Sequence, residues 1–314
     1  MKVVSRKALL LASVVALTAT LFSFPTGTAS ASTDSENVTV FPNGYATNRG
    51  VTAAYPDRVI RFFPSVPTTT RQKFLSVATQ YNAAGARLKF GPSTTTRSTN
   101  PFDVTIEVVP GPFKCGETLA RGCAFVQYGH ISGQRVAHSV HIQFGSQILG
   151  KPDELKTLLH ETGHVFGLGH YEQRYAGGRQ VMSTANFAQD KLGAGDINGV
   201  RALTRKFDNP FGSLDVVTVA DGKVSVAGWA FDSNDPGKNV DVHVYVNGTY
   251  SRALFAGLPR TDVRTYLRLS TVNAGYAGEV TRGLRPGLNG VCTYAINVGA
   301  GTTNPLLGCR LIVI

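Results

Sequence analysis

Residues 160–170 read HETGHVFGLGH, a run that places three histidines and one glutamate close together. His160 and His164 are four residues apart, so on a helix they lie on one face, one turn above the other. Two imidazoles in that arrangement can both reach a metal ion about 2.0–2.1 Å away. A continued helix would carry His170 roughly 9 Å further along the axis than His164, too far to share the ion. The chain is therefore expected to turn back before it reaches His170.

Glycine can adopt a left-handed turn conformation without steric cost, and Gly167 and Gly169 stand where that turn is needed. Glu161 projects about 100° round the helix from His160, beside the ion and not onto it. That position suits a general base for a zinc-bound water, whose pKa the metal lowers to about 7. Structural zinc sites commonly include cysteine, and no cysteine lies near this run. The pattern predicts one catalytic Zn²⁺ held by His160, His164 and His170.

This HExxHxxGxxH pattern resembles the metzincin clan of zinc endopeptidases, and two downstream features extend the resemblance over roughly residues 57–204. Val181-Met182-Ser183 is similar to the Met-turn of the clan, whose methionine forms an apolar floor beneath the histidines. Residues 192–203, LGAGDINGVRAL, are similar to the last helix of matrixins, with Gly195 in place of its first aspartate.

Tyr171 and Thr184 depart from the patterns of the individual metzincin families, so the resemblance is to the clan. It implies an α+β catalytic domain with a mixed sheet and three helices, and the short strands predicted after residue 210 add an all-β sandwich domain. The apolar periodicity agrees with its element order. It predicts a helix over 68–84, a helix carrying the first two histidines, and strands over 58–63, 102–109, 124–128 and 139–144.

An unpaired strand edge beside the metal offers backbone hydrogen bonds to an extended peptide, whatever its side chains. The resemblance places such an edge strand after Cys123. A loop closed by Cys115 and Cys123 would brace it. On the residues alone, a merely structural loop is an equally good interpretation.

Residues 1–31 have the features of a signal peptide. Lys2, Arg6 and Lys7 form a basic start, an apolar run follows, and Ala29-Ser30-Ala31 fits a cleavage site. No other stretch is long enough to span a bilayer, so we expect a secreted, extracellular protein without stable membrane insertion. Together with the resemblances, this export signal implies a bacterial source.

An exported chain with four cysteines is expected to form two disulfides. Three pairings are formally open. Cys115–Cys123 and Cys292–Cys309 are local, and each falls inside one expected domain, so this pairing is favoured.

The chain carries a formal net charge of +11, which raises the question of nucleic acid binding. Its lysines and arginines are scattered, without a basic run or aromatic interleaving, so no nucleic acid partner is expected. Attraction to an anionic wall or membrane surface is the better inference, and an ordinary solvated surface explains the charge equally well.

The motifs, composition and apolar periodicity of the sequence predict four segments: a signal peptide (1–31), an N-terminal arm (32–55), a zinc metallopeptidase domain (56–210) and a C-terminal β-sandwich (211–314). The last contains alternating valines over 240–246 and resembles a domain found in secreted actinobacterial proteins. A cell-wall or surface ligand is one reading of this domain. Trp229, Tyr245 and Tyr250 could form a sugar-stacking face, although a lone tryptophan is more often core.

Two other groups of residues contain side chains that can bind metals. His130, His138 and His141 occupy the region in which matrixins carry a structural zinc, but their spacing does not match and no acidic residue lies among them. Asp232-Ser-Asn-Asp235 offers oxygen ligands for calcium, although acidic loops are usually turns. Neither site is expected from the sequence.

The function predicted from the sequence is a secreted zinc endopeptidase acting on protein or peptide substrates, with Glu161 as general base and with Gly167 and Met182 supporting the histidines. Two alternatives remain open. One is a zinc hydrolase that cleaves amides of cell-wall peptides, and the other is a surface-binding protein in which the zinc domain is secondary.

Overall fold

The computed structural model of the protein describes residues 30–31, 38–97, 100, 102–185, 188–280 and 282–314. The expected signal peptide therefore lies outside the described residues except for 30–31, and so do residues 32–37 of the expected arm. Among the described residues, no helix is both long and apolar enough to cross a membrane.

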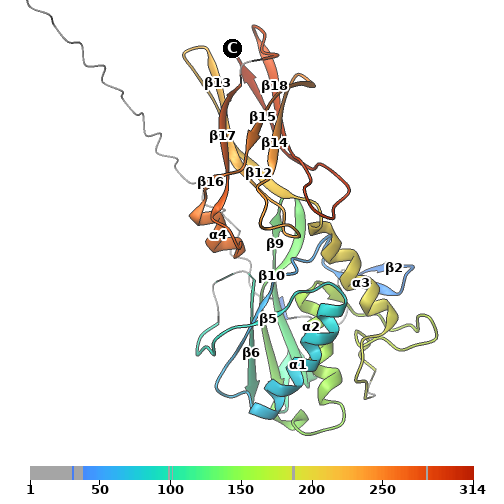
Figure 1. Ribbon diagram of the computed structural model, residues 1–314. Coiled ribbons are helices and arrows are strands. Elements are labelled where there is room, and N and C mark those ends of the chain that lie inside the picture. Colours follow the sequence, from blue (N-terminus) through green and yellow to red (C-terminus); the bar gives the residue numbers. More distant parts are fainter. Residues whose placement is uncertain (1–29, 32–37, 98–99, 101, 186–187, 281) are drawn as a thin grey trace, which may run out of the picture.

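The elements follow one another from a strand-rich first half to an almost entirely β second half (Figure 1). The α-helices are α1 (Thr68–Ala83), α2 (Glu154–Val165), α3 (Ala194–Thr204) and α4 (Thr261–Leu267). Short 3₁₀ turns cover Ser146–Ile148 and Arg205–Phe207.

Up to residue 169 the strands are β1 (Ser30–Ala31), β2 (Val38–Phe41), β3 (Tyr45–Asn48), β4 (Val59–Phe62), β5 (Lys89–Phe90), β6 (Asp103–Val109), β7 (Phe113–Cys115), β8 (Thr118–Ala120), β9 (Gly122–Ile131), β10 (Gln134–Gly145) and β11 (Leu168–Gly169). From residue 211 they are β12 (Phe211–Ala220), β13 (Lys223–Phe231), β14 (Asp241–Val246), β15 (Thr249–Phe255), β16 (Leu258–Pro259), β17 (Asn273–Val280), β18 (Leu288–Ala295) and β19 (Leu306–Val313).

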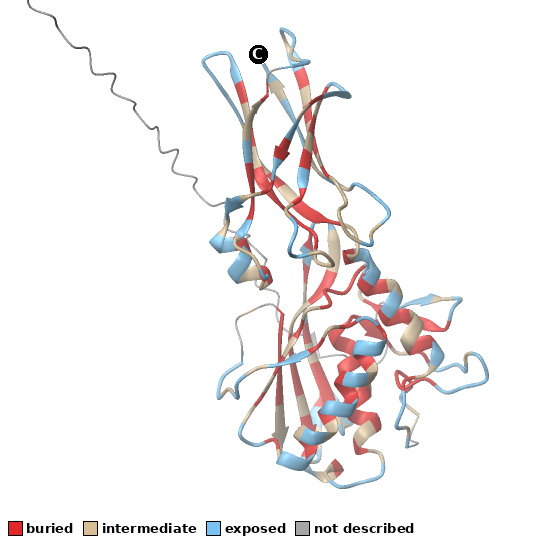
Figure 2. Ribbon diagram, in the orientation of Figure 1, coloured by how far each residue is buried: buried red, intermediate tan, exposed pale blue. Residues whose placement is uncertain are grey.

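A six-stranded sheet with the order β1-β9-β10-β6-β4-β5 forms the centre of the first half. Strands β10, β6, β4 and β5 are parallel, and β9 runs antiparallel to β10. Helices α1 and α2 pack against this sheet and share one apolar core with it. Figure 2 colours the buried residues of these elements red. This packing places α2 beside β9.

Helix α1 forms because its apolar residues recur every three or four positions. Phe74, Val77, Ala78 and Tyr81 are buried on one face. The Tyr81 hydroxyl donates a hydrogen bond to the Leu159 carbonyl of α2 at 2.7 Å. Helix α1 therefore fixes the position of the helix that carries the first two histidines.

The N-terminal segment contributes a second, three-stranded sheet with the order β11-β3-β2. Strand β3 is buried throughout, and β11, which immediately follows the turn after α2, pairs with it at Leu168–Thr47 and Gly169–Ala46. The described part of the expected arm is thus a hairpin that supports the chain leading to His170.

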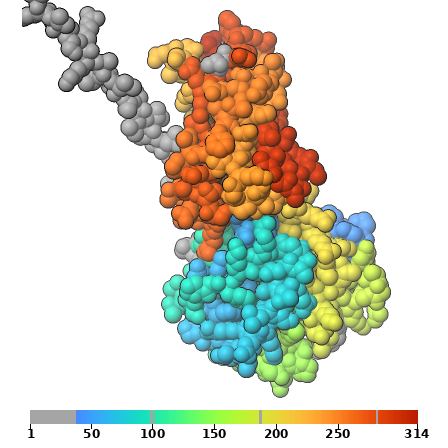
Figure 3. Space-filling view, in the orientation of Figure 1, coloured from blue at the N-terminus to red at the C-terminus, as the bar shows by residue number. Residues whose placement is uncertain are grey.

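Beyond residue 210 the chain forms two four-stranded sheets, β12-β13-β17-β16 and β15-β14-β18-β19, which enclose one apolar core. Strand β14 illustrates the cause: Val242, Val244 and Val246 point inward and are buried, while the residues between them face outward. In Figure 3 these residues, orange to red, form a lobe that rests on the lobe of the earlier residues.

The fold class predicted from the sequence, an α+β metzincin-like catalytic domain with a mixed sheet and three helices followed by an all-β sandwich domain, is wrong. The described residues are mostly β, with five sheets and only four α-helices. The apolar periodicity predicts strands that are shorter than those in the structure. Ser132 and Gly133 have φ angles of 48° and 78°, as a tight hairpin turn requires, so β9 and β10 extend to this turn instead of ending near Tyr128 and Ser139.

A third apolar cluster joins the two halves of the chain. Residues on both sides of residue 210 belong to it: Ala53, Tyr55, Phe102, Ile131, Val136, Phe207, Phe211, Trp229, Phe231, Val263, Leu267, Leu269 and Ala274. Trp229 is only 3% exposed, so it belongs to this core and not to a sugar-stacking face. The two halves therefore bury apolar surface against each other.

Polar contacts accompany this cluster. The Tyr55 hydroxyl donates to the Leu267 carbonyl at 2.8 Å, and Ser132 exchanges hydrogen bonds of 2.8 and 3.0 Å with the backbone of Gly212. Arg268 forms an ion pair with the buried Asp103. Because these contacts fix side chains from both halves, we expect the halves to unfold cooperatively.

His138 lies in the same interface, with its Nε2 2.8 Å from the hydroxyl oxygen of Tyr266. Burial, with a smaller contribution from the positive charge of Arg58, lowers the pKa of His138 to about 4. Burial, followed by the charge of Arg97, also lowers the pKa of His141 to about 4. An unfolded histidine has a pKa of about 6.5, so the fold favours the neutral form of both.

Acidification should therefore destabilise the protein. The contribution of these histidines is fully present above about pH 6.5 and is lost as the pH falls toward 4, because the unfolded chain takes up protons first. We expect His138→Phe to retain more of its stability over this range, with His141 accounting for part of the remaining loss. Denaturant titrations between pH 7.5 and 4.5 measure the slope. The exposed His130→Phe serves as control, and an unchanged slope in His138→Phe would contradict the assignment.

Candidate metal centre

Helix α2 and the turn after it bring the three histidines together. The ring centroids of His160, His164 and His170 are each 5.1 Å from the other two. The Nε2 atoms of His160 and His170 are 3.2 Å apart, and one ligand atom from each of the three rings lies within 4.8 Å of the others. Such a group of nitrogen atoms could hold a metal ion.

Hydrogen bonds at the far nitrogen orient two of the rings. Nδ1 of His160 donates to the Val181 carbonyl at 2.6 Å, and Nδ1 of His164 donates to the Leu168 carbonyl at 2.8 Å. A proton held on Nδ1 leaves the Nε2 lone pair free to bind a metal. Backbone carbonyls thus set the tautomer that a metal site needs.

The electrostatic surroundings keep both rings neutral. Burial, then the neighbouring His170, lowers the pKa of His160 to about 3. Burial, followed by the imidazoles of His160 and His170, holds the pKa of His164 well below its usual value. A neutral imidazole is the metal-binding form, so neither ring must lose a proton before it can act as a ligand at neutral pH.

The reversal toward His170 depends on Gly167. Its φ is +77°, and a Cβ added there would lie 2.5 Å from Cγ1 of Val51. Gly169, which was also expected to form the turn, instead lies in strand β11 opposite Ala46. The turn is therefore made at one glycine, and the second allows close approach of the β3 backbone, with Thr47 atoms 3.1–3.2 Å from its Cβ position.

Met182 packs against α2 at Gly163. It is 2% exposed, and a Cβ added to Gly163 would lie 2.1 Å from the Met182 sulfur. Gly163, which sequence reasoning did not single out, thus leaves the space that the methionine fills. The signal was present in the chain, since a glycine inside an amphipathic helix usually has a packing reason.

Asp196, at the start of α3, holds the turn that contains Met182. Its carboxylate accepts hydrogen bonds from the backbone N–H groups of Val181, Met182 and Gly193 at 2.7, 3.3 and 2.7 Å. A Cβ added to Gly195 would lie 1.8 Å from the Gly44 carbonyl oxygen, so no side chain fits at that position. The backbone of the N-terminal hairpin at Gly44 therefore requires glycine at position 195.

Glu161 lies in the wall of a cleft that also exposes the three histidines. The cleft has a volume of about 400 Å³ and is bounded by α2, by residues 115–124 and by residues 183–185. Glu161 is 6% exposed. Its Cγ and Oε1 lie 2.7 Å from the position of a Cβ on Gly122, so the absence of a side chain at Gly122 lets the carboxylate approach β9.

The two rims of the cleft are braced differently. Cys115 and Cys123 form the expected disulfide, which ties β7 to the start of β9, and Leu119 between them is 68% exposed. On the opposite rim, the buried Lys156 ammonium donates to the carbonyls of Ser183 and Ala185 at 2.8 and 2.7 Å. The cleft therefore has fixed walls beside the histidines.

Strand β9 lies where an unpaired edge strand was expected beside the metal, but β1 pairs with it, so β9 is not the edge of this sheet. The pairing with β1 is at Phe125 and Val126. Gly122, Cys123 and Ala124, nearer the histidines, line the cleft.

The secondary metal candidates have other partners. His141 lies 2.9 Å from Thr105 Oγ1 and 3.2 Å from Glu107 Oε2, and His138 faces Tyr266. Asp232 accepts hydrogen bonds from the backbone of Asn234 and Val298, while Asp235 pairs with Lys238 at 2.8 Å. Within the described part of the chain, His160, His164 and His170 are the one group of three such side chains that could hold a metal.

Comparison with known proteins adds little to this geometry. No family model matches the chain, and no curated protein is similar to it. Solved structures with similarity include one described as "Crystal structure of Br derivative BhCBM56". It is 13% identical, covers 34% of this chain and 94% of its own, and has a TM-score of 0.20. Similarity at this level supports no conclusion about fold or ligand.

Gly167→Ala tests the link between the turn and the metal ligands. The added methyl would both strain a left-handed residue and overlap Val51, so we expect a loss of stability of about 1–3 kcal/mol and weaker metal binding. Gly177→Ala is the matched control, because Gly177 has a similar φ of +75° with no atom within 4 Å of its Cβ position. Metal titration and denaturant unfolding compare them. Equal metal affinity in the two variants would show that Val51 contact does not position His170.

Proposed function

We propose that the protein is a secreted zinc-dependent endopeptidase. The observation that carries the proposal is the convergence of His160, His164 and His170 with the carboxylate of Glu161 in one open cleft. The two disulfides are consistent with an extracellular protein.

The three histidines fit Zn²⁺ by the chemistry of their donors. Zinc prefers nitrogen and sulfur ligands, and three protein ligands with an accessible fourth side are typical of catalytic sites. A bound Zn²⁺ would supply a Lewis acid that polarises a carbonyl and acidifies water. The hydrogen bonds from His160 and His164 to backbone carbonyls would hold these ligands in place before the ion binds.

Glu161 is assigned as the general base. Its carboxylate lies in the cleft wall beside the histidines, so it can take a proton from an attacking water and return it to the leaving amine. Contact with Gly122 would keep the carboxylate on the β9 side of the cleft. The start of β9 has backbone groups at the same place, and an extended peptide could pair with them.

The first test uses the whole secreted protein with unfolded casein as substrate. We expect cleavage that is abolished by a chelator and restored by Zn²⁺. The same assay with isolated cell-wall peptides separates the two hydrolytic functions. Hydrolysis of cell-wall peptides but not of casein would favour an amidase, and no hydrolysis of either by a zinc-loaded protein would contradict both.

The second test separates the base from the ligands. Glu161→Gln keeps the size of the side chain and all three imidazoles, so zinc content should stay near one per chain while turnover falls about 10²–10⁴-fold. His164→Ala removes a ligand, so zinc content and turnover should fall together. Elemental analysis beside peptide hydrolysis measures both. The surface variant Glu279→Gln controls for loss of a carboxylate, and near-normal turnover in Glu161→Gln would refute the assigned mechanism.

A further inference from the structure

One sheet of the C-terminal half carries aromatic residues on its outward face. Alternation along β14 sends Val242, Val244 and Val246 into the core, so His243 and Tyr245 face outward. The neighbouring strands add Tyr250 from β15 and Tyr294 from β18 on the same face, since these residues contact His243 and Tyr245. We call these four residues the aromatic row.

The row crosses three strands as a chain of ring contacts. Tyr250 is 5.2 Å from His243 and 5.8 Å from Tyr245, and Tyr245 is 5.4 Å from Tyr294, measured between ring centroids. The planes of these pairs meet at 67–79°. The rings therefore present a stepped surface and not a flat platform.

The polar tips of the aromatic row have no hydrogen-bond partner among the described residues. Three hydroxyls and one imidazole are therefore left for solvent or a ligand. Tyr250 is 47% exposed, and the other three are partly exposed. An outward sheet face would ordinarily carry charged or small polar residues in such positions. In this protein the outward face combines apolar ring surface with a hydrogen-bonding group at each residue of the aromatic row.

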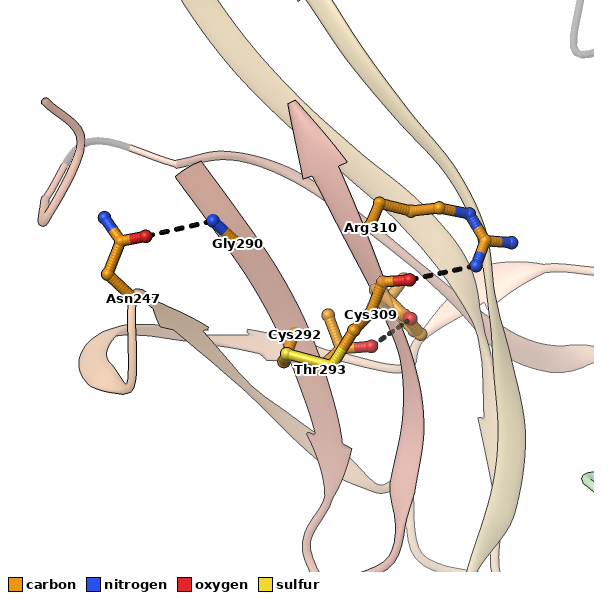
Figure 4. The surroundings of a disulfide bond; sticks show 7 residues. Asn247, Gly290, Cys292, Thr293, Cys309 and Arg310 are labelled. Carbon is orange, nitrogen blue, oxygen red and sulfur yellow. Dashed lines mark hydrogen bonds between the residues drawn. A yellow bond between two sulfur atoms is a disulfide. The ribbon is translucent and has the colours of Figure 1, made fainter. Parts of the chain in front are cut away.

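A disulfide stiffens this face. Cys292 lies directly opposite Tyr245 in the β14–β18 pair, and it is bonded to Cys309 of the edge strand β19 (Figure 4). In the same strand pair, His243 lies opposite Tyr294. Because the strands beneath the rings are cross-linked and paired in register, the aromatic row is held in shape before any ligand binds.

We propose that the aromatic row binds a β-1,4-linked polysaccharide chain. Sugar rings with equatorial substituents offer apolar C–H faces to aromatic rings and hydroxyls to the tyrosine and histidine tips. Neighbouring rings of the row are separated by about the length of one sugar unit. A β-1,4-linked chain is extended and can follow a row across a sheet, whereas an α-1,4-linked chain coils away from it.

The composition of the row favours a glycan over a protein partner. Protein interfaces centre on a buried, close-packed apolar anchor. The row contains no aliphatic residue, and its rings expose hydroxyls along its length. Leu306 of β19 is exposed and lies opposite Tyr294 at one end of the row. The other large aliphatic side chains exposed on this sheet, Leu288, Leu311 and Val313, lie on β18 and β19 beyond the disulfide. They supply a matched control for nonspecific apolar adhesion.

The experiment measures binding of the full-length protein to chitohexaose and cellohexaose by titration calorimetry, with maltohexaose as the α-linked comparison. We expect binding to at least one β-linked hexamer and weaker binding to maltohexaose. Tyr250→Ala and Tyr245→Ala should each weaken it by roughly tenfold, the size expected from loss of one aromatic contact. Leu311→Ala, which removes a side chain that is 75% exposed on the same sheet, should leave the affinity unchanged.

Thermal unfolding of each variant establishes that it is folded, and the exposed Tyr250 provides the readout if Tyr245→Ala unfolds. Three results would overturn the proposal. They are the absence of binding to both β-linked hexamers at millimolar concentration, unchanged affinity in the folded tyrosine variants, and an equal loss in Leu311→Ala. None of these results bears on the zinc site, because the row is assayed without substrate turnover.

Discussion

Three imidazole nitrogens that converge on one point impose the strictest requirement in this structure. Helix geometry supplies two of them, but the third needs a chain reversal within a few residues of the helix end. The reversal is possible because Gly167 adopts a positive φ against Val51. It is then held by pairing of β11 with β3. The N-terminal hairpin is therefore part of the histidine site, although it contributes no ligand.

The sequence allowed prediction of those features whose cause is local. The spacing of His160 and His164 follows from the helical repeat, helix α1 from its apolar period, and the two disulfides from the placement of cysteines in the chain. Gly122 and Gly163 escaped prediction for the opposite reason. Gly122 is needed because the side chain of Glu161 packs against it, and Gly163 because the side chain of Met182 does. Both side chains are distant in the sequence, so the sequence around each glycine does not show which residue packs there.

The error in fold class has the same origin. Alternation of apolar residues predicts short strands here, but β9 and β10 continue because each supplies backbone partners to the other up to the turn at Ser132 and Gly133. Hydrogen bonding between strands depends on the partner, so the propensity of a single segment underestimates it. Residues 38–48 had no evident period, yet they form a hairpin because β11 and α3 cover β3.

The hairpin of β9 and β10 also determines how the two halves act together. Its beginning, at Gly122, approaches Glu161, and its turn, at Ile131 to Val136, lies in the apolar cluster shared with Trp229. A flexible linker would let the cleft sample a large volume around a surface to which the other half is bound. Here the connection is a paired ribbon fixed in a core at one end.

If the aromatic row holds a wall polysaccharide, the cleft is held at a set distance and direction from it. Substrates anchored in that polymer then gain effective concentration only where this geometry reaches them. Rigid attachment would thus favour substrates according to their position on the polysaccharide, in addition to any preference for their amino-acid sequence.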